Sequence, residues 1–195
     1  SGYASYDANE IEFHLASTYV TLDMPKVMRN PLAINDLSGV VDIQLGEENV
    51  EVSTDYLLLN TPDVKLATQF KIKIPENNSP HLNVTARFED VDGTQASAYL
   101  PAKIMDEESV NWLDNAIVTS YIPQGGLVFY GNVDGYPYDD GSGRMQALFD
   151  VNNGTLRYQD EWPTITNLSA TLEFVNNSLS IKNGAGNIFD ATVSN

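Results

Sequence analysis

The chain has 195 residues, 42% of them hydrophobic, so it can bury a core and is not expected to be disordered. Its 27 acidic and 10 basic residues give a net charge of −17, which argues against binding nucleic acid and against electrostatic docking on anionic lipid headgroups. Because it contains no cysteine, disulfides and zinc–thiolate sites are excluded.

No targeting or membrane-spanning segment is visible in the sequence. No apolar run approaches the roughly 18 residues of a spanning helix, and residues 1–10 lack the basic and apolar blocks of a signal peptide. The last residues, 191–195, form no polar tail. We therefore expect the chain to be a segment of a longer protein.

The first half is dominated by short segments in which apolar and polar residues alternate. The clearest are residues 66–74 and 82–88, which the turn-forming residues 75–80 separate. Alternation with period two predicts strands that have one apolar face. Further strands are expected at 11–15, 18–22, 39–45, 49–53 and 56–59.

One segment breaks this period. Apolar residues recur at helical spacing over residues 105–120, and Asp106 is suited to cap a helix that carries acidic residues in its first turn. The pattern predicts one amphipathic helix over residues 106–119. We expect it to pack on the sheet through four residues: Val110, Trp112, Leu113 and Ile117.

The second half returns to alternation, with strands expected at 126–131, 144–151, 154–159, 167–175 and 178–182. Short strands joined by short turns, without alternating helices, favour an antiparallel meander of about ten strands. Residues 34–44 and 165–175 also resemble each other in their order of apolar and polar residues. This similarity has two interpretations, a repeated strand-turn-strand module or coincidence between two amphipathic strands.

Residues 134–145 hold three acids, but no register of this stretch matches a calcium loop, because Tyr136 and Tyr138 fall where oxygen ligands are required. We predict a hairpin connection without metal. Pro137 would fix the entry of this connection, and Gly141 and Gly143 would be free to adopt positive φ.

Catalytic arrangements are missing from the sequence. There is no G-x-S-x-G elbow, and no other metal ligands flank His14 or His81 at a suitable spacing. We predict no enzyme, no cofactor and no metal. One enzymatic interpretation of the protein is not excluded by the sequence, namely a carboxylate-dependent glycosidase. It would require two acids roughly 5 to 10 Å apart in a cleft.

Several motifs stand out in the second half of the chain. In chain order they are Tyr99-Leu-Pro101, Trp112-Leu113, Gly131, Tyr136-Pro137-Tyr138, Gly143, and Tyr158 with Trp162-Pro163. Together they resemble the AsmA-like family, most closely its YhdP branch. The resemblance is specific over residues 99–174 and looser over residues 1–98, and it indicates a single AsmA-like segment over residues 1–195.

The resemblance implies a periplasmic segment of an inner-membrane-anchored protein of Gram-negative bacteria. Its strongly curved antiparallel sheet would form an apolar groove that conducts phospholipid between the inner and outer membranes. The membrane anchor is expected outside this segment, and adjacent AsmA-like repeats of the same chain would flank it. The family motifs are structural and carry no catalytic residue.

The sequence thus predicts a mainly β protein with one helix and a non-enzymatic groove for phospholipid acyl chains. The alternative is a β-sandwich module that binds glycans or protein, in which a second sheet would close over the apolar face. Ten apolar residues are expected to line the groove: Phe70, Ile72, Val84, Phe88, Leu127, Phe129, Ala147, Phe149, Leu172 and Phe174.

Overall fold

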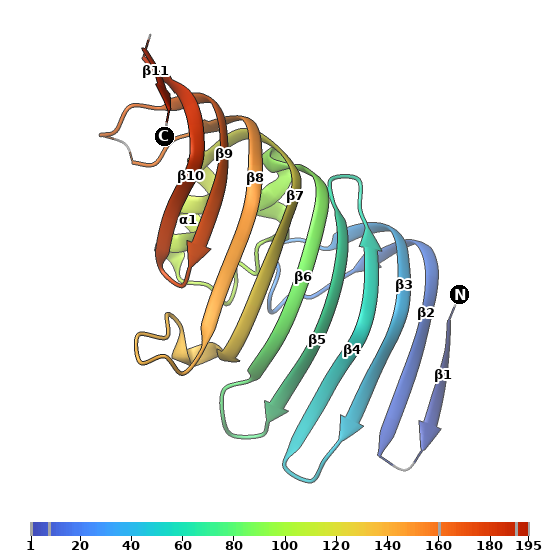
Figure 1. Ribbon diagram of the computed structural model, residues 1–195. Helices are drawn as coiled ribbons and strands as arrows, with labels where there is room; N and C mark the ends of the chain where they lie inside the picture. Colours follow the sequence, from blue (N-terminus) through green and yellow to red (C-terminus); the bar gives the residue numbers. More distant parts are fainter. Residues whose placement is uncertain (1, 8, 160, 190, 195) are drawn as a thin grey trace.

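The computed structural model describes residues 2–7, 9–159, 161–189 and 191–194. Its eleven strands form one curled antiparallel sheet (Figure 1). The strands are β1 (Gly2–Asp7), β2 (Glu10–Leu22), β3 (Leu32–Leu45), β4 (Asn49–Asn60), β5 (Lys65–Pro75), β6 (His81–Asp92), β7 (Ile117–Asn132), β8 (Arg144–Leu156), β9 (Ile165–Val175), β10 (Ser178–Ile188) and β11 (Ala191–Ser194).

The spatial order of the strands is their order in the chain, so each strand pairs only with its sequence neighbours. This order confirms the predicted antiparallel meander, and the curl of the sheet in Figure 1 confirms the predicted curvature. Within the described residues no second sheet packs on the first. The β-sandwich alternative is therefore wrong, because a sandwich requires two sheets that face each other.

Several strands are longer than the sequence predicts. Residues 49–53 and 56–59 belong to the single strand β4, and residues 144–151 and the start of 154–159 belong to β8. The alternation breaks within these strands because the backbone bulges there, between Thr54 and Leu57 in β4 and between Val151 and Gly154 in β8. Residues 11–15 and 18–22 likewise form one strand, β2. Neither β1 nor β11 was predicted.

Asparagines mark the bulges of the last strands. Asn153 in β8, Asn167 in β9 and Asn183 in β10 have φ of 54°, 52° and 50°, and the pairing registers shift beside each of them. Asparagine tolerates this left-handed conformation better than most residues. Because bulges bend a strand and increase its twist, three in adjacent strands curl this part of the sheet, as the curved upper ends in Figure 1 show.

The two rims of the sheet differ. At one rim, the turn rim, tight turns join β3 to β4 and β5 to β6. The opposite rim, the long-loop rim, carries the segments 23–31, 93–116, 157–159 and 161–164. Segment 93–116 includes the 3₁₀ helix η1 (Gly93–Tyr99) and the helix α1 (Glu107–Ala116).

Helix α1 begins where the sequence predicts but ends earlier. Asp106 caps it, since its Oδ1 accepts a hydrogen bond from the Ser109 N–H at 2.8 Å, and this bond lowers the pKa of the Asp106 carboxyl. The predicted end at residue 119 is wrong. Ile117 is already extended and pairs with Leu156, so strand pairing replaces the helix after Ala116.

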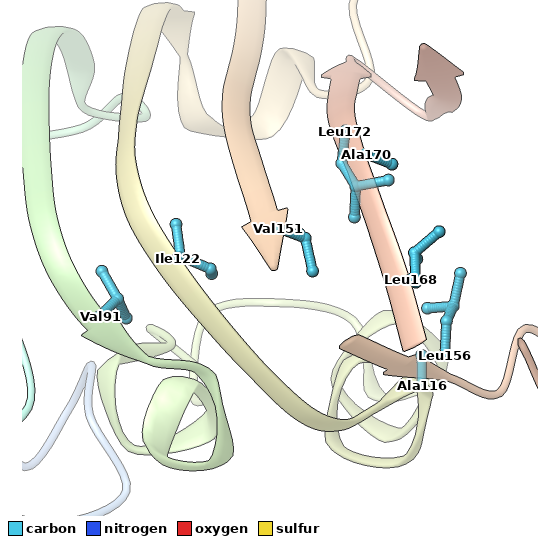
Figure 2. Packing of buried hydrophobic residues seen from close by; sticks show 8 residues of the cluster. All are labelled: Val91, Ala116, Ile122, Val151, Leu156, Leu168, Ala170 and Leu172. Carbon is cyan, nitrogen blue, oxygen red and sulfur yellow. The ribbon is translucent and has the colours of Figure 1, made fainter. Parts of the chain in front are cut away.

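The hydrophobic core lies at one end of the concave face, between the strands and α1 (Figure 2). Its buried members come from β6 to β9 and from the last residue of α1, and they are Val91, Ala116, Ile122, Val151, Leu156, Leu168, Ala170 and Leu172. No residue of β2, β3 or β5 belongs to this cluster. The core therefore stabilises mainly the C-terminal half of the sheet.

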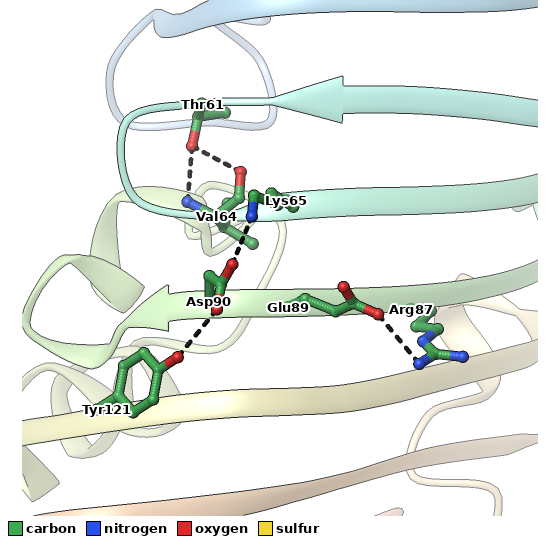
Figure 3. A network of polar contacts seen from close by, with 7 residues as sticks. All are labelled: Thr61, Val64, Lys65, Arg87, Glu89, Asp90 and Tyr121. Carbon is green, nitrogen blue, oxygen red and sulfur yellow. Dashed lines mark hydrogen bonds and ion pairs between the residues drawn. The ribbon is translucent and has the colours of Figure 1, made fainter.

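The opposite, convex face carries charged side chains. Near the long-loop rim the Asp90 carboxylate accepts hydrogen bonds from Lys65 Nζ at 2.5 Å and from the Tyr121 hydroxyl at 2.9 Å (Figure 3). The Lys65 bond, followed by the Tyr121 bond, lowers the pKa of Asp90. These contacts join β5, β6 and β7 at the point where Asp90 has a φ of 54°.

Candidate functional site

The pairing registers bring the ten predicted groove residues onto one face of the sheet. Alternation directs every second side chain of a strand to the same face, and opposite residues of neighbouring strands share that face. Ile72 and Phe88 lie an even number of residues from Phe70 and Val84. The cross-strand pairs are Phe70–Val84, Val84–Phe129, Leu127–Ala147, Ala147–Phe174 and Phe149–Leu172.

Over residues 66–74 of β5 and 82–88 of β6 this concave face is open. Its side chains are Leu66, Thr68, Phe70, Ile72, Ile74, Leu82, Val84, Ala86 and Phe88, and none of them is buried. Ile74 remains 42% exposed. The hydroxyl of Thr68, the one polar residue among them, donates to the Thr85 carbonyl at 3.0 Å. These two strands thus present apolar surface without charge.

On β8 and β9 the same face is covered. The Phe149 and Phe174 rings stack at 5.9 Å, and Trp112 of α1 meets Phe174 edge-on at 6.3 Å. Leu172 is only 3% exposed, and Phe88 packs against the same core. Four of the ten predicted residues therefore lie within or against the hydrophobic cluster that α1 completes.

Trp112 holds the predicted helix on the sheet. Its ring packs on the core, and its Nε1 donates a hydrogen bond to the Tyr158 carbonyl at 2.8 Å. Val110 and Leu113 are half-buried, as an amphipathic stripe requires. Ile117, the fourth predicted packing residue, belongs to β7 instead of α1.

The loop at residues 133–143 is the predicted hairpin connection, here between β7 and β8. Tyr138 fills it and is only 3% exposed, with its ring at 5.8 Å from Phe129 and its hydroxyl donating to the Asn132 carbonyl. Gly141 has the expected positive φ, but Gly143 does not. A glycine is nevertheless required at Gly143, because a Cβ there would lie 2.4 Å from the Tyr138 ring and clash with it.

Tyr138 thus covers the concave face of β7 beside the turn rim. The sequence predicts the loop but not this role, although an aromatic residue between glycines was the available signal. In the described part of the chain, no group of three or more His, Cys, Asp or Glu residues could hold a metal ion.

A second covering element, the strap (residues 23–31), was not predicted. It connects β2 to β3 and extends toward the middle of the sheet (Figure 1). The Val27 carbonyl accepts from the Lys103 N–H at 3.0 Å, and the Pro25 carbonyl accepts from Lys103 Nζ at 2.7 Å. Arg29 pairs with Asp114 of α1 at 2.8 Å. The strap therefore ties the N-terminal strands to segment 93–116.

The convex face carries a shallow hollow of about 430 Å³ over Gly126. It forms because Gly126 has no side chain between its partners Arg87 and Leu148. Charged residues share its lining with apolar ones, and it lies on the face opposite the predicted groove. The hollow is thus a packing gap of the outer surface.

In the described part of the chain, no helix is both long and apolar enough to cross a membrane. A single curled sheet with an apolar concave face, part of it uncovered, defines an open β-groove protein. The chain matches the YhdP protein family over residues 1–195, and it belongs to that family.

One relative of this chain is the intermembrane phospholipid transporter YhdP of Escherichia coli (strain K12). The two sequences are 28% identical over 169 residues, which cover 87% of this chain and 13% of that protein. The chain thus spans a small part of the length of its relative. No solved structure matches it significantly.

Proposed function

We propose that this chain is a non-enzymatic periplasmic segment of an inner-membrane-anchored AsmA-like protein. In this proposal it binds phospholipid acyl chains on its concave face and conducts them between the inner and outer membranes. The observation that carries the proposal is the open apolar face over residues 66–74 of β5 and 82–88 of β6, where no concave residue is buried or charged. The name of the Escherichia coli relative supports the choice of phospholipid.

The physical chemistry of this face fits acyl chains. Each methylene that leaves water on such a surface gains about 0.8 kcal/mol, so partial burial of one chain supports binding. No charged partner is needed for this. A net charge of −17 agrees, because the protein gains nothing from attraction to anionic headgroups.

The proposal also includes neighbours in the longer chain. β1 and β11 each pair with one strand only among the described residues, so both expose backbone groups on one side. Adjacent repeats would add strands there and extend the groove. The membrane anchor would lie in another part of the longer chain.

A matched pair of substitutions on β6 tests the proposal. Val84→Asp places a charge on the open concave face, whereas Thr85→Asp places the same charge on the exposed convex face one residue later. Both would be made in the full-length protein, which is purified, extracted into organic solvent and analysed for phospholipid by mass spectrometry. We expect Val84→Asp to lose most co-purified lipid and Thr85→Asp to keep it. Equal lipid in two folded variants would contradict the proposal.

A further inference from the structure

The open and covered parts of the concave face form one continuous apolar surface. Val84 of β6 pairs with Phe129 of β7, and Ala86 continues through Leu127 to Ala147 of β8. No charged residue interrupts these rows. Where the surface reaches β8 and β9, however, Trp112 of α1 rests on it. The helix therefore lies where acyl chains would continue along the sheet.

The segment that carries α1 is fixed firmly at its two ends. Tyr99 is held at the first end, since its hydroxyl lies 2.6 Å from Thr61 Oγ1 and donates to Asp63 at 2.9 Å. At the second end Ala116 is fully buried, and its carbonyl accepts from the Arg157 N–H at 2.8 Å. Residues 100–115, which we name the lid, lie between these anchors.

The lid itself is held loosely. None of residues 100–115 is buried, and Ile104 is 52% exposed. Its Trp112 ring packs against the hydrophobic cluster of the sheet. Three polar contacts to the strap add to this, two from Lys103 and one between Asp114 and Arg29. The strap thus connects the open half of the sheet to the lid and can hold the lid in place.

We propose that the lid is a gate on the groove, which the strap holds closed and which must lift before acyl chains can occupy the face of β8 and β9. This inference rests on the proposed function. When the lid lifts, an acyl chain replaces the Trp112 ring on Phe174, which stacks on Phe149. One apolar contact is exchanged for another, so the open state does not leave the aromatic residues in water.

A reversible covalent lock tests the gate. Val27→Cys with Lys103→Cys joins strap and lid where their backbones already meet at 3.0 Å, and the segment contains no other cysteine. Lipid contact is read by replacing Phe70 or Phe149 with a photo-reactive phenylalanine derivative in the full-length protein. Cells grown with radioactive phosphate are irradiated, and the label that becomes attached to the protein is measured. Phe70 reports the open half, and Phe149 reports the covered half.

In the oxidised protein we expect lipid cross-linking at Phe70 to persist and cross-linking at Phe149 to fall severalfold. A reductant should restore the signal at Phe149. Equal cross-linking at Phe149 in both states would overturn the gate, and so would its absence from both, because the covered half would then be permanent core. Loss of the signal at Phe70 in both states would instead contradict the proposed function.

The Trp112→Ala variant provides a second test of the gate that needs no disulfide. It removes the aromatic contact between lid and sheet while leaving the anchors at Tyr99 and Ala116 unchanged. We expect more lipid cross-linking at Phe149 and an unchanged signal at Phe70, which also shows that the sheet remains folded. A variant with an unchanged signal at Phe149 would overturn the gate.

Discussion

Two regions of the sheet, β5–β6 and β8–β9, present the same kind of concave face but differ in what covers it. Phe70 lies half-buried on an open surface, whereas Phe149 stacks on Phe174, against which Trp112 of the helix packs. The difference arises outside the strands, in segment 93–116. Sheet alternation therefore makes a face apolar, and the long loops decide whether that face becomes core or groove.

The two regions also differ in how much they contribute to the stability of the protein. The buried cluster lies in β6 to β9 and α1, so the free energy of unfolding depends chiefly on the covered region. The open region contributes less buried surface and keeps its apolar side chains available. Substitutions of the same type should consequently have different effects in the two regions.

The largest difference is expected for leucine truncation. Leu172→Ala removes a side chain that is 3% exposed in the core and should cost about 2–5 kcal/mol of unfolding free energy. Leu82→Ala on the half-exposed face of β6 should cost about 1 kcal/mol, because less surface leaves water there on folding. Urea unfolding of both variants measures the difference. Equal costs would show that the open face is also closed core in solution.

The next effect concerns the loop that covers β7 beside the turn rim. Gly143→Ala would place a Cβ 2.4 Å from the Tyr138 ring and 2.6 Å from the Tyr130 carbonyl, so we expect a loss of about 1–3 kcal/mol. Gly126→Ala is the control, because the nearest atom to its Cβ would lie at 3.5 Å. Thermal unfolding of the two variants measures the effect. Should Gly143→Ala be as stable as Gly126→Ala, Tyr138 does not pack as described.

The sequence predicted the parts of this comparison that depend on local pattern. Alternation over residues 66–74 and 82–88 assigned β5, β6 and their apolar face, since each strand there is regular. The cap at Asp106 located the start of α1 because capping is decided by a few adjacent residues. The family motifs between residues 99 and 174 added the curvature.

Other parts could not be predicted because they depend on contacts distant in sequence. The break before Gly154 indicated a strand end, whereas it marks a bulge at Asn153 that pairing with β9 allows. The helix pattern continued through Ile117, but pairing with Leu156 ends it. Which groove residues would be covered depended on where Trp112 comes to rest, and periodicity gives no information about that.

A smaller effect is expected at the cap of the lid helix. Asp106→Ala should cost about 0.5–2 kcal/mol, because the Ser109 N–H loses its acceptor, whereas Asp106→Asn should cost little. The pKa of Asp106 is lowered on folding, so its contribution is present above the ordinary carboxyl pKa and is lost as pH falls through the lower folded value. The difference in unfolding free energy between the unsubstituted protein and Asp106→Ala should therefore shrink in acid. Unfolding curves at neutral pH and below pH 4 measure it, and a constant difference would contradict this assignment.

The smallest effect, and the one of opposite sign, is expected on the convex face of the open half. Asp42 lies directly opposite Glu12 on β2, and like charges in opposed positions are unfavourable. Burial first, and then the carboxylates of Glu12, Glu10 and Asp55, raise the pKa of Asp42. The folded protein thus holds this proton more tightly than the unfolded chain does, so the ionised carboxylate reduces stability at neutral pH.

Asp42→Asn should therefore raise the melting temperature slightly at pH 7. This gain should disappear as pH falls below about 3.9, the unfolded pKa, where both states carry the proton. Asp150→Asn in the covered half is the control, since the Asp150 carboxylate accepts a hydrogen bond from Thr171 at 2.8 Å. It should show no gain at pH 7. If both variants gain equally, the effect reflects the total negative charge of the protein, and the local repulsion between β2 and β3 does not explain it.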